Sequence, residues 1–250
     1  MHRFFVPPES ISQGLVTFDA ALAHQLRNVL RMRPGEQVTA LDDSGWEYLV
    51  ELTSLEPDRA LGCVCGQNPS QGEPRLRLTL YQSMLKGDRF EWVLQKGTEL
   101  GVSAFVPVLS RRSVVRDAGR MEKRRPRWER ILREAAEQSR RGRLPQLAVP
   151  VSFDAACRES VRVHDLSLIP WEDAGTGSLL DALRALDAPP KSVALLIGPE
   201  GGFEREEVML ARRQEIGVVT LGPRILRAET AALASVAIVM SELGEMGAGR

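Results

Sequence analysis

The sequence predicts an α/β protein whose larger part is built on a parallel sheet and follows a small β-barrel. Residues 193–197 form an unbroken apolar run, which is typical of a strand buried on both faces of a parallel sheet. Residues 75–109 show the order strand, helix, strand, and such a unit implies parallel pairing. Near the N-terminus, short strand patterns with close turns and no long helix indicate the barrel.

The first domain is expected to cover residues 1–72. Its predicted elements are a helix at residues 19–31 and strands at residues 38–41, 48–55 and 61–64. On the helix, Leu22, Leu26 and either Val29 or Leu30 are expected to share the inner side. The opposite side carries polar and basic residues that could contact phosphates, and a solvated helix face is the alternative.

The second domain is expected at residues 73–250, after a linker-like stretch at residues 67–74. Its predicted strands are residues 75–81, 104–109, 166–170, 193–197 and 218–221. Its predicted helices are residues 88–100, 127–140, 179–186, a helix from residue 204 onward, and residues 231–243. Gly101 is expected to be the C-cap of the first of these helices. The second of these helices is amphipathic and is expected to bury Trp128, Ile131, Leu132 and Ala135. The last helix is nearly all apolar, so we expect it to be buried on most sides.

Two glycine-containing loops follow the last two strands, at strand ends that we expect to be adjacent in the sheet. They are residues 198–202 and residues 222–230. A Gly-rich turn lets backbone amides approach a ligand closely at the carboxyl edge of a parallel sheet. Neither loop has the G-x-G-x-x-G or G-x-x-x-x-G-K-[ST] pattern, so the ligand is not expected to be held by its phosphates. The alternative interpretation is a pair of ordinary strand-to-helix turns.

The composition, 43% hydrophobic and 26% charged, is that of an ordinary soluble protein. The first residues do not have the pattern of a signal peptide, and no apolar run is long enough to predict a membrane span. Cys63, Cys65 and Cys157 form neither a disulfide framework nor a zinc site, which favours a reducing cytoplasm. Cys63 and Cys65 share one face of a predicted strand, and we expect them to be small buried apolar residues.

Positive charge is concentrated in one segment of a chain whose formal net charge is zero. Residues 111–143 contain thirteen Lys and Arg against five Asp and Glu, and arginine dominates. Because guanidinium groups bind phosphate bidentately and stack on bases, this segment favours a polyanionic partner such as RNA or DNA. A solvated helical face is the alternative.

Several motifs along the chain share a pattern with one known family. They are MHRFF at the start, His24 and Arg27 with Leu30-Arg31 and Pro34-Gly35-Glu36, Lys86-Gly87-Asp88-Arg89 leading to Gln95–Gly101, Ile197–Phe203, and Leu221–Ala231. Together they resemble the RsmE family, which are 16S ribosomal RNA uridine N3-methyltransferases of the SPOUT superfamily. The resemblance covers essentially the whole chain, and the last two motifs are highly specific in combination.

The resemblance implies an RNA-binding PUA-like β-barrel at residues 1–72 and a SPOUT methyltransferase domain with a C-terminal trefoil knot at residues 73–250. It also implies S-adenosylmethionine as the cofactor, a homodimer, 16S rRNA of the small ribosomal subunit as the substrate and a cytoplasmic location, with no metal and no membrane. One departure is the strand end at Trp171-Glu172, where relatives favour a shorter apolar-then-acid pattern.

Methylation at uridine N3 needs either a base that accepts the proton or a cation that stabilises the anion. Arg227 is the candidate for stabilising the anion or orienting the base, and Glu229 for holding that arginine or taking the proton; the alternative is an ion pair that only shapes the loop. The residues expected to enclose the cofactor are Leu196, Gly198, Pro199, Glu200, Gly201, Gly202, Leu221, Gly222, Ile225, Leu226, Thr230 and Ala231. Those expected to contact RNA are Arg3, His24, Arg27, Arg31, Lys86, Lys96, Arg140, Arg141 and Arg143.

Three other functions stay open at this point. A SPOUT ribose 2′-O-methyltransferase would share the fold, but the Asn-x-Gly-x-x-Arg pattern of those enzymes does not occur in the sequence. A pure RNA-binding or ribosome-assembly protein would need the basic segment but not the paired glycine loops. A small-molecule α/β enzyme would leave the basic segment unexplained.

Overall fold

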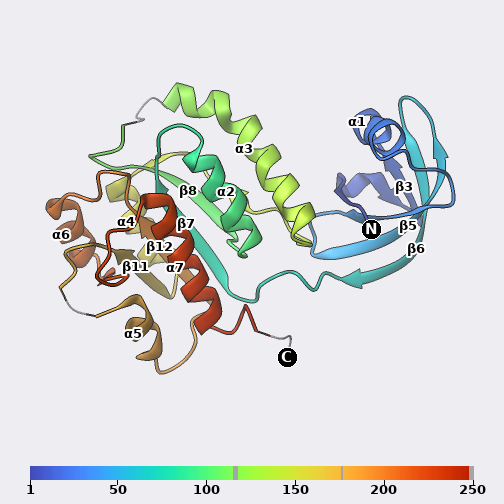
Figure 1. The fold of residues 1–250 in the computed structure, drawn as a ribbon. Coiled ribbons are helices and arrows are strands. Elements are labelled where there is room, and N and C mark those ends of the chain that lie inside the picture. The colour runs from blue at the N-terminus through green and yellow to red at the C-terminus, as the bar shows by residue number, and fades with distance from the viewer. Residues whose placement is uncertain (115–117, 176, 248–250) are drawn as a thin grey trace. The chain divides into compact units, whose positions relative to one another are not determined.

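The computed structural model describes residues 1–114, 118–175 and 177–247 (Figure 1). The chain divides into two compact units, Met1–Glu73 with Ala136–Leu144, and Pro74–Ala135 with Pro145–Arg250. The first unit thus includes a short stretch from the middle of the chain that the sequence placed in the second domain. Arg116 and Asp117 of the basic segment lie outside the described residues.

The first unit is built on a six-stranded sheet with the order β1-β4-β5-β6-β3-β2. The strands are β1 (Arg3–Phe5), β2 (Ile11–Ser12), β3 (Leu15–Phe18), β4 (Gln37–Leu41), β5 (Trp46–Leu55) and β6 (Ala60–Pro69). All neighbours are antiparallel except β1 and β4, which are parallel. The three predicted strands are confirmed, whereas β1 to β3 are too short to give a clear pattern in the sequence. The sheet encloses a core that includes Phe4, Phe18, Leu26 and Val38.

The predicted helix of this unit is α1 (Ala20–His24), which continues as a π-helix, η2 (Gln25–Val29). Asp19 caps its start, since the Asp19 carboxylate accepts a hydrogen bond from the Leu22 amide at 2.9 Å. Leu26 is fully buried, but Val29 is 65% exposed, so Val29 does not belong to the inner side. The wider π turn shifts each later side chain relative to an α-helix, which brings Leu30 partly into the core instead.

The expectation that Cys63 and Cys65 are buried is wrong. Both side chains are exposed, while Cys157 is buried. The two residues do alternate onto one face of β6, but the inward positions of that strand are taken by Ala60 and Gly62. Strand alternation predicts which residues share a face, and it does not predict which face is inside.

The first unit also contains residues 136–144 because Glu73 holds them. Its carboxylate accepts hydrogen bonds from the amides of Gly142 and Arg143, at 2.9 and 3.0 Å. The same carboxylate pairs with the guanidinium group of Arg141 at 3.1 Å. A single acid therefore joins two stretches that are far apart in the sequence.

The second unit has a parallel sheet with the order β10-β8-β7-β12-β11-β13, and β9 also pairs with β8. The strands are β7 (Arg77–Ser83), β8 (Ala104–Leu109), β9 (Gln146–Leu147), β10 (Val151–Ser152), β11 (Leu166–Pro170), β12 (Ser192–Ile197) and β13 (Gly217–Val219). The helices are α2 (Arg89–Glu99), α3 (Ala118–Gln138), α4 (Phe153–Val163), α5 (Leu179–Arg184), α6 (Arg205–Arg213) and α7 (Ala228–Glu242). Figure 1 shows helices on both sides of this sheet.

Two buried clusters cover the two faces of the sheet. On one face, Phe90 of α2, Trp128 of α3 and Val236 of α7 lie in the larger cluster. On the other, Phe153 of α4 and Val208 of α6 lie in the second cluster. The predicted unit of strand, helix and strand is confirmed, since β7 and β8 pair in parallel. Within the described helices, none is long and apolar enough to cross a membrane.

The strands before the two glycine loops are not adjacent. β11 lies between β12 and β13 and pairs with both in parallel. Consecutive strands of a parallel sheet often pair, but the order of the strands depends on how the connections cross the sheet. The two loops therefore lie on either side of the carboxyl end of β11.

One helix, α3, differs from its predicted bounds, whereas α7 is buried as predicted. α3 begins at Ala118 and includes Pro126, although the sequence predicted a start just after this proline. Trp128, Leu132 and Ala135 are buried as expected, whereas Ile131 is only partly buried. α7 fully buries Ala228, Ala232, Ser235, Val236, Val239 and Met240, and only Thr230 and Ser241 of this helix are exposed, which agrees with the expected burial on most sides.

An ion-pair cluster holds the first half of α3 against α2. Glu91, whose side chain is 6% exposed, pairs with Arg124 at 2.6 Å and with Arg127 at 2.7 Å. Burial alone would raise the pKa of Glu91, but the hydrogen bonds from Arg127 and Arg124 outweigh it and hold this pKa below its ordinary value. Removing both arginines would leave a buried carboxylate without a counter-charge.

The double change Arg124→Ala and Arg127→Ala is expected to lower the free energy of unfolding by about 3 kcal/mol at pH 7. The exposed pair of Arg130 and Glu134, at 3.6 Å on the same helix, provides the control, and Arg130→Ala should cost less than about 1 kcal/mol. Because the pKa of Glu91 is depressed in the folded state, its stabilising effect is present above the ordinary glutamate pKa of about 4.3 and is lost as the pH falls. In urea unfolding, the difference in free energy of unfolding between the wild type and the double variant should be smaller at pH 3 than at pH 7. An equal difference at both pH values would contradict this role of Glu91.

Candidate cofactor and substrate site

The candidate site lies at the carboxyl edge of the parallel sheet, where three loops follow three neighbouring strands. We name them the Gly198 loop (residues 198–204, after β12), the Trp171 loop (residues 171–175, after β11) and the Gly222 loop (residues 220–227, after β13). All three belong to the second unit. Parallel α/β proteins bind their ligands at this edge.

The Gly198 loop is a tight turn that needs glycine at two positions. Gly202 has a φ of +69°, and a Cβ atom there would lie 2.7 Å from the carboxylate of Glu172. A Cβ atom at Gly198 would lie 3.2 Å from the ring of Phe203. The Gly202 amide closes the turn by donating to the Pro199 carbonyl at 2.9 Å. The loop backbone is thus fixed against the Trp171 loop on one side and the core on the other.

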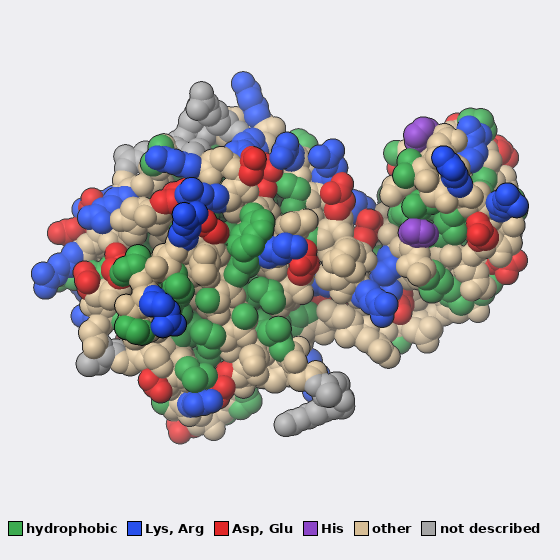
Figure 2. All heavy atoms as spheres, in the orientation of Figure 1, with side chains coloured by type: hydrophobic (Ala, Val, Ile, Leu, Met, Phe, Trp, Pro, Cys, Tyr) green, Lys and Arg blue, Asp and Glu red, His purple; other side chains and the backbone are tan. Residues whose placement is uncertain are grey.

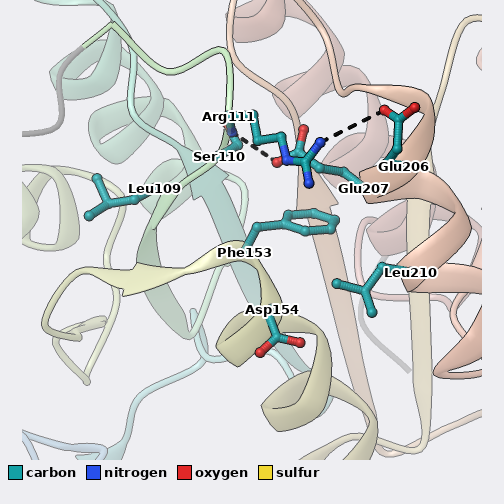
Figure 3. Close-up of a pocket in the computed structure, with 8 residues that line it drawn as sticks. All are labelled: Leu109, Ser110, Arg111, Phe153, Asp154, Glu206, Glu207 and Leu210. Carbon is teal, nitrogen blue, oxygen red and sulfur yellow. Dashed lines mark hydrogen bonds and ion pairs between the residues drawn. The ribbon is translucent and has the colours of Figure 1, made fainter.

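Two consecutive arginines hold the Gly198 loop from the side of β8. Arg112 donates from Nη1 to the Gly201 carbonyl at 2.8 Å. The Arg111 amide donates to Glu207 at 2.9 Å, and its guanidinium group donates to Glu204 at 3.0 Å. The adjacent cavity has a volume of about 380 Å³. Among its lining residues, Arg111 faces Glu206 and Glu207 above the ring of Phe153 (Figure 3). No residue predicted to bind the cofactor lines this cavity, so it is separate from the candidate site.

Arg89 of α2 connects the Gly198 loop to the start of α7. Its Nη1 atom donates to Glu200 Oε1 at 3.2 Å, and its Nε atom lies 3.8 Å from Glu229 Oε1. Glu200 also accepts a hydrogen bond from the Lys86 amide at 2.8 Å. The second oxygen of Glu229, Oε2, is buried and has no hydrogen-bond partner. Glu229 therefore has one oxygen facing Arg89 and one buried oxygen without a hydrogen-bond partner.

Glu229 does not hold Arg227 as the sequence suggested. In the described part of the chain no ion pair joins them, because Glu229 faces Arg89. Arg227 is exposed, and its side chain forms no hydrogen bond or ion pair among the described residues. Its backbone is extended at the N-cap of α7, and its side chain makes no capping bond. The guanidinium group is thus available to a ligand.

The Gly222 loop and the Trp171 loop enclose a small cavity of about 80 Å³. Gly222 has a φ of +104°, and a Cβ atom there would meet nothing within 4 Å, so its outer side is open. Ile225 beside it is 82% exposed. Of the predicted cofactor residues, those that line this cavity are Leu221, Gly222, Ile225, Leu226 and Ala231.

The other predicted cofactor residues lie in the Gly198 loop, in the first turn of α7 and in the buried core. Gly198, Pro199, Glu200, Gly201 and Gly202 form the neighbouring Gly198 loop, and Thr230 is exposed in the first turn of α7. The side chain of Leu196 is 1% exposed and packs in the second cluster, so it cannot present a surface to a ligand. Lining residues that the sequence did not predict are Pro170, Trp171, Glu172, Thr220 and Arg224. The only feature of the sequence that pointed to any of these residues is the Trp171-Glu172 strand end, which departs from the pattern of the family.

The basic residues predicted to contact RNA differ in their availability. Arg141 is 3% exposed and paired with Glu73, so its inclusion is corrected: it stabilises the first unit. Arg3 is paired with Glu47 at 2.6 Å, and Lys96 with Glu99 at 2.8 Å. The remaining residues have exposed side chains: His24, Arg27, Arg31, Lys86, Arg140 and Arg143. Of these, Arg143 donates to the backbone carbonyls of Asp43 and Ser44.

Metal ligands do not gather anywhere in residues 1–114, 118–175 and 177–247. Within these ranges, no group of three or more His, Cys, Asp or Glu side chains could hold a metal ion.

The fold and the site define an RNA methyltransferase with an accessory PUA domain. A family model of the RNA methyltransferase domain matches residues 72–240, and one of the RNA methyltransferase PUA domain matches residues 18–62. The predicted fold class, a SPOUT α/β domain beside a PUA-like domain, is confirmed.

The particular family follows from the relatives. The chain is 36% identical over 220 residues to ribosomal RNA small subunit methyltransferase E of Bacillus subtilis, covering 86% of each chain. It is 34% identical to the protein of that name from Synechocystis, over 94% of this chain and 76% of the relative. The crystal structure of ribosomal RNA small subunit methyltransferase E from Neisseria gonorrhoeae bound to S-adenosyl methionine is 35% identical, with a TM-score of 0.85 over 96% of this chain and 97% of that one. The chain belongs to the ribosomal RNA small subunit methyltransferase E family, RsmE.

Proposed function

We propose that this protein transfers a methyl group from S-adenosylmethionine to N3 of a uridine in 16S rRNA of the small ribosomal subunit, giving 3-methyluridine. The single observation that carries the proposal is the set of glycine loops at the carboxyl edge of the sheet, in a chain of the RsmE family. Because the substrate is ribosomal, we also infer that the protein acts in the cytoplasm.

The residues of the Gly222 loop fit an adenosyl group. Leu221, Leu226 and the 82% exposed Ile225 offer apolar surface that a flat ligand would bury. The open side of Gly222 lets a ligand approach the backbone closely. The small size of the cavity means that the rest of the cofactor would lie along the Gly198 loop, whose turn is held by Arg112 and Arg89.

When bound, S-adenosylmethionine supplies an activated methyl group, so the chain has to place a uridine and make its N3 atom nucleophilic. Arg227, whose exposed side chain has no partner among the described residues, is the candidate for stabilising negative charge on the base. Glu229 Oε2, buried and without a partner, is a candidate acceptor for the N3 proton. The target base would have to be splayed out of the RNA to reach them.

The experiment that tests the proposal is transfer of a labelled methyl group from S-adenosylmethionine to unmodified 16S rRNA, offered as free RNA and as small subunits. Label in RNA after removal of protein supports the function. Folded protein that binds 16S rRNA but transfers no label to either substrate would favour the RNA-binding alternative.

A further prediction concerns Arg89, which we propose positions the cofactor loops. Arg89→Ala should raise the dissociation constant for S-adenosylmethionine about fivefold, because Glu200 and Glu229 lose a shared charged partner that is 45% exposed. Lys86→Ala is the matched control, since only the backbone of Lys86 contacts Glu200. Calorimetric titration of both variants checks this, and an unchanged affinity in Arg89→Ala would remove the positioning role.

We also infer that the protein is a homodimer that associates through α2 and α7. Figure 2 shows hydrophobic side chains gathered over these helices. Trp92 of α2 is 44% exposed, and Leu233, Ala234 and Ile238 of α7 are only partly buried. Such a contiguous apolar surface is typical of a contact between subunits. A monomeric mass in sedimentation equilibrium at micromolar concentration would contradict this inference.

A further inference from the structure

A cavity of about 530 Å³ lies beside the candidate site, also within the second unit. It is lined by Trp171 and Asp173 of the Trp171 loop and by the outer face of α6. Trp171 also lines the small cavity of the Gly222 loop, so the two cavities share this residue. The volume lies within the range of about 300–1,000 Å³ that is typical of small-ligand sites.

The α6 side of this cavity carries two arginines. Arg205 and Arg212 are seven residues apart, which places them about two turns apart on one face of the helix. In the described part of the chain, neither guanidinium group forms a hydrogen bond or an ion pair, and both side chains are exposed. Asp173 is the only acidic residue in the lining, so the cavity has an excess of positive charge.

The cavity wall opposite α6 includes Trp171, an aromatic residue whose backbone is held in place. The Trp171 amide donates to the Val219 carbonyl at 2.9 Å, which ties the residue to the end of β13. Its side chain is partly exposed, and the neighbouring Met209 of α6 is 50% exposed. An aromatic face next to unpaired guanidinium groups is how proteins bind single-stranded nucleic acid: bases stack on the ring and phosphates pair with the cations.

We propose that this cavity binds a nucleotide of the single-stranded RNA substrate adjacent to the methylated uridine, with its base on Trp171 and its phosphates paired with Arg205 and Arg212. The proposal rests on the function proposed above. When the target base is splayed out toward the Gly222 loop, it no longer stacks on the neighbouring bases. The base of a neighbouring nucleotide then needs another surface on which to stack. Trp171, shared by both cavities, provides one at the right place.

The test measures binding of unmodified 16S rRNA to the full chain at several salt concentrations. The double variant Arg205→Gln and Arg212→Gln should reduce the slope of log affinity against log salt by about 0.7 for each phosphate that the arginines no longer neutralise. Arg213→Gln is the control for the loss of one arginine, because Arg213 is the last residue of α6 and does not line the cavity, so the slope should stay that of the wild type. Trp171→Ala should weaken RNA binding about tenfold, and Trp171→Phe should restore most of it.

Affinity for S-adenosylmethionine should be unchanged in the arginine double variant, which separates this site from the cofactor site. If the wild-type protein methylates RNA but the double variant keeps the wild-type salt slope and affinity, this inference is overturned and the proposed function stands. If the wild-type protein transfers no methyl group, the proposed function itself fails. If the variants change the sedimentation mass and not the RNA affinity, the surface contacts another protein chain, which also overturns the inference.

Discussion

Replacement of Arg227 with alanine is expected to lower the rate of methyl transfer about a hundred- to a thousandfold, which is the usual effect of removing one group that stabilises developing negative charge. Affinity for S-adenosylmethionine should change little. Arg227 is exposed, and its side chain has no partner among the described residues and does not cap α7. The substitution therefore removes no contact on which the fold depends, and the loss should appear in the chemical step.

Single-turnover kinetics and calorimetric titration of the cofactor separate these two effects. Arg213→Ala, which removes an exposed arginine at the end of α6, is the control for general loss of positive charge. Arg227→Lys should recover part of the rate, since it keeps the charge but not the planar fork. If the rate of methyl transfer and the affinity for S-adenosylmethionine fall together in Arg227→Ala, Arg227 belongs to the cofactor pocket and does not act on the uridine.

Replacement of Gly201 with valine is expected to raise the dissociation constant for S-adenosylmethionine roughly 5- to 150-fold, which corresponds to the 1–3 kcal/mol typical of overpacking. No left-handed φ occurs at Gly201, and a Cβ atom there would lie 3.4 Å from Arg112, an ordinary contact. The loop can therefore accept a side chain without refolding. A branched side chain would nevertheless occupy the surface along which we expect the cofactor to lie.

Gly201→Ala is the matched control, because its single methyl group fits the space beside Arg112. It should bind the cofactor several times more tightly than the valine variant, and both should unfold at similar temperatures. Wild-type affinity in Gly201→Val would show that the Gly198 loop is not part of the cofactor site.

Much of the second unit could be predicted because its strands have strong local signals. The apolar run of β12 and the glycine turn after it place the Gly198 loop correctly, and β11 has the bounds that its sequence predicts. The order of the strands could not be predicted, because the position of β11 between β12 and β13 depends on long-range pairing. For this reason the contribution of Trp171 to the site was not expected.

Side-chain partners that are distant in the sequence were also beyond prediction. Arg141 looks like any other residue of the basic segment, yet Glu73, 68 residues earlier, pairs with it and buries it. Glu229 likewise faces Arg89 of α2 and not the nearby Arg227. Local sequence indicates which charges are present, but their partners are determined by the tertiary fold.

The central claim is that this chain methylates a uridine base of 16S rRNA at N3. The most direct test is nucleoside mass analysis of unmodified 16S rRNA after incubation with the protein and S-adenosylmethionine, as free RNA and within small subunits. We predict 3-methyluridine as the product, and that Arg227→Ala does not form it at a comparable rate. A methylated ribose, a different methylated base, or no modified nucleoside from folded protein that binds the cofactor would contradict this function.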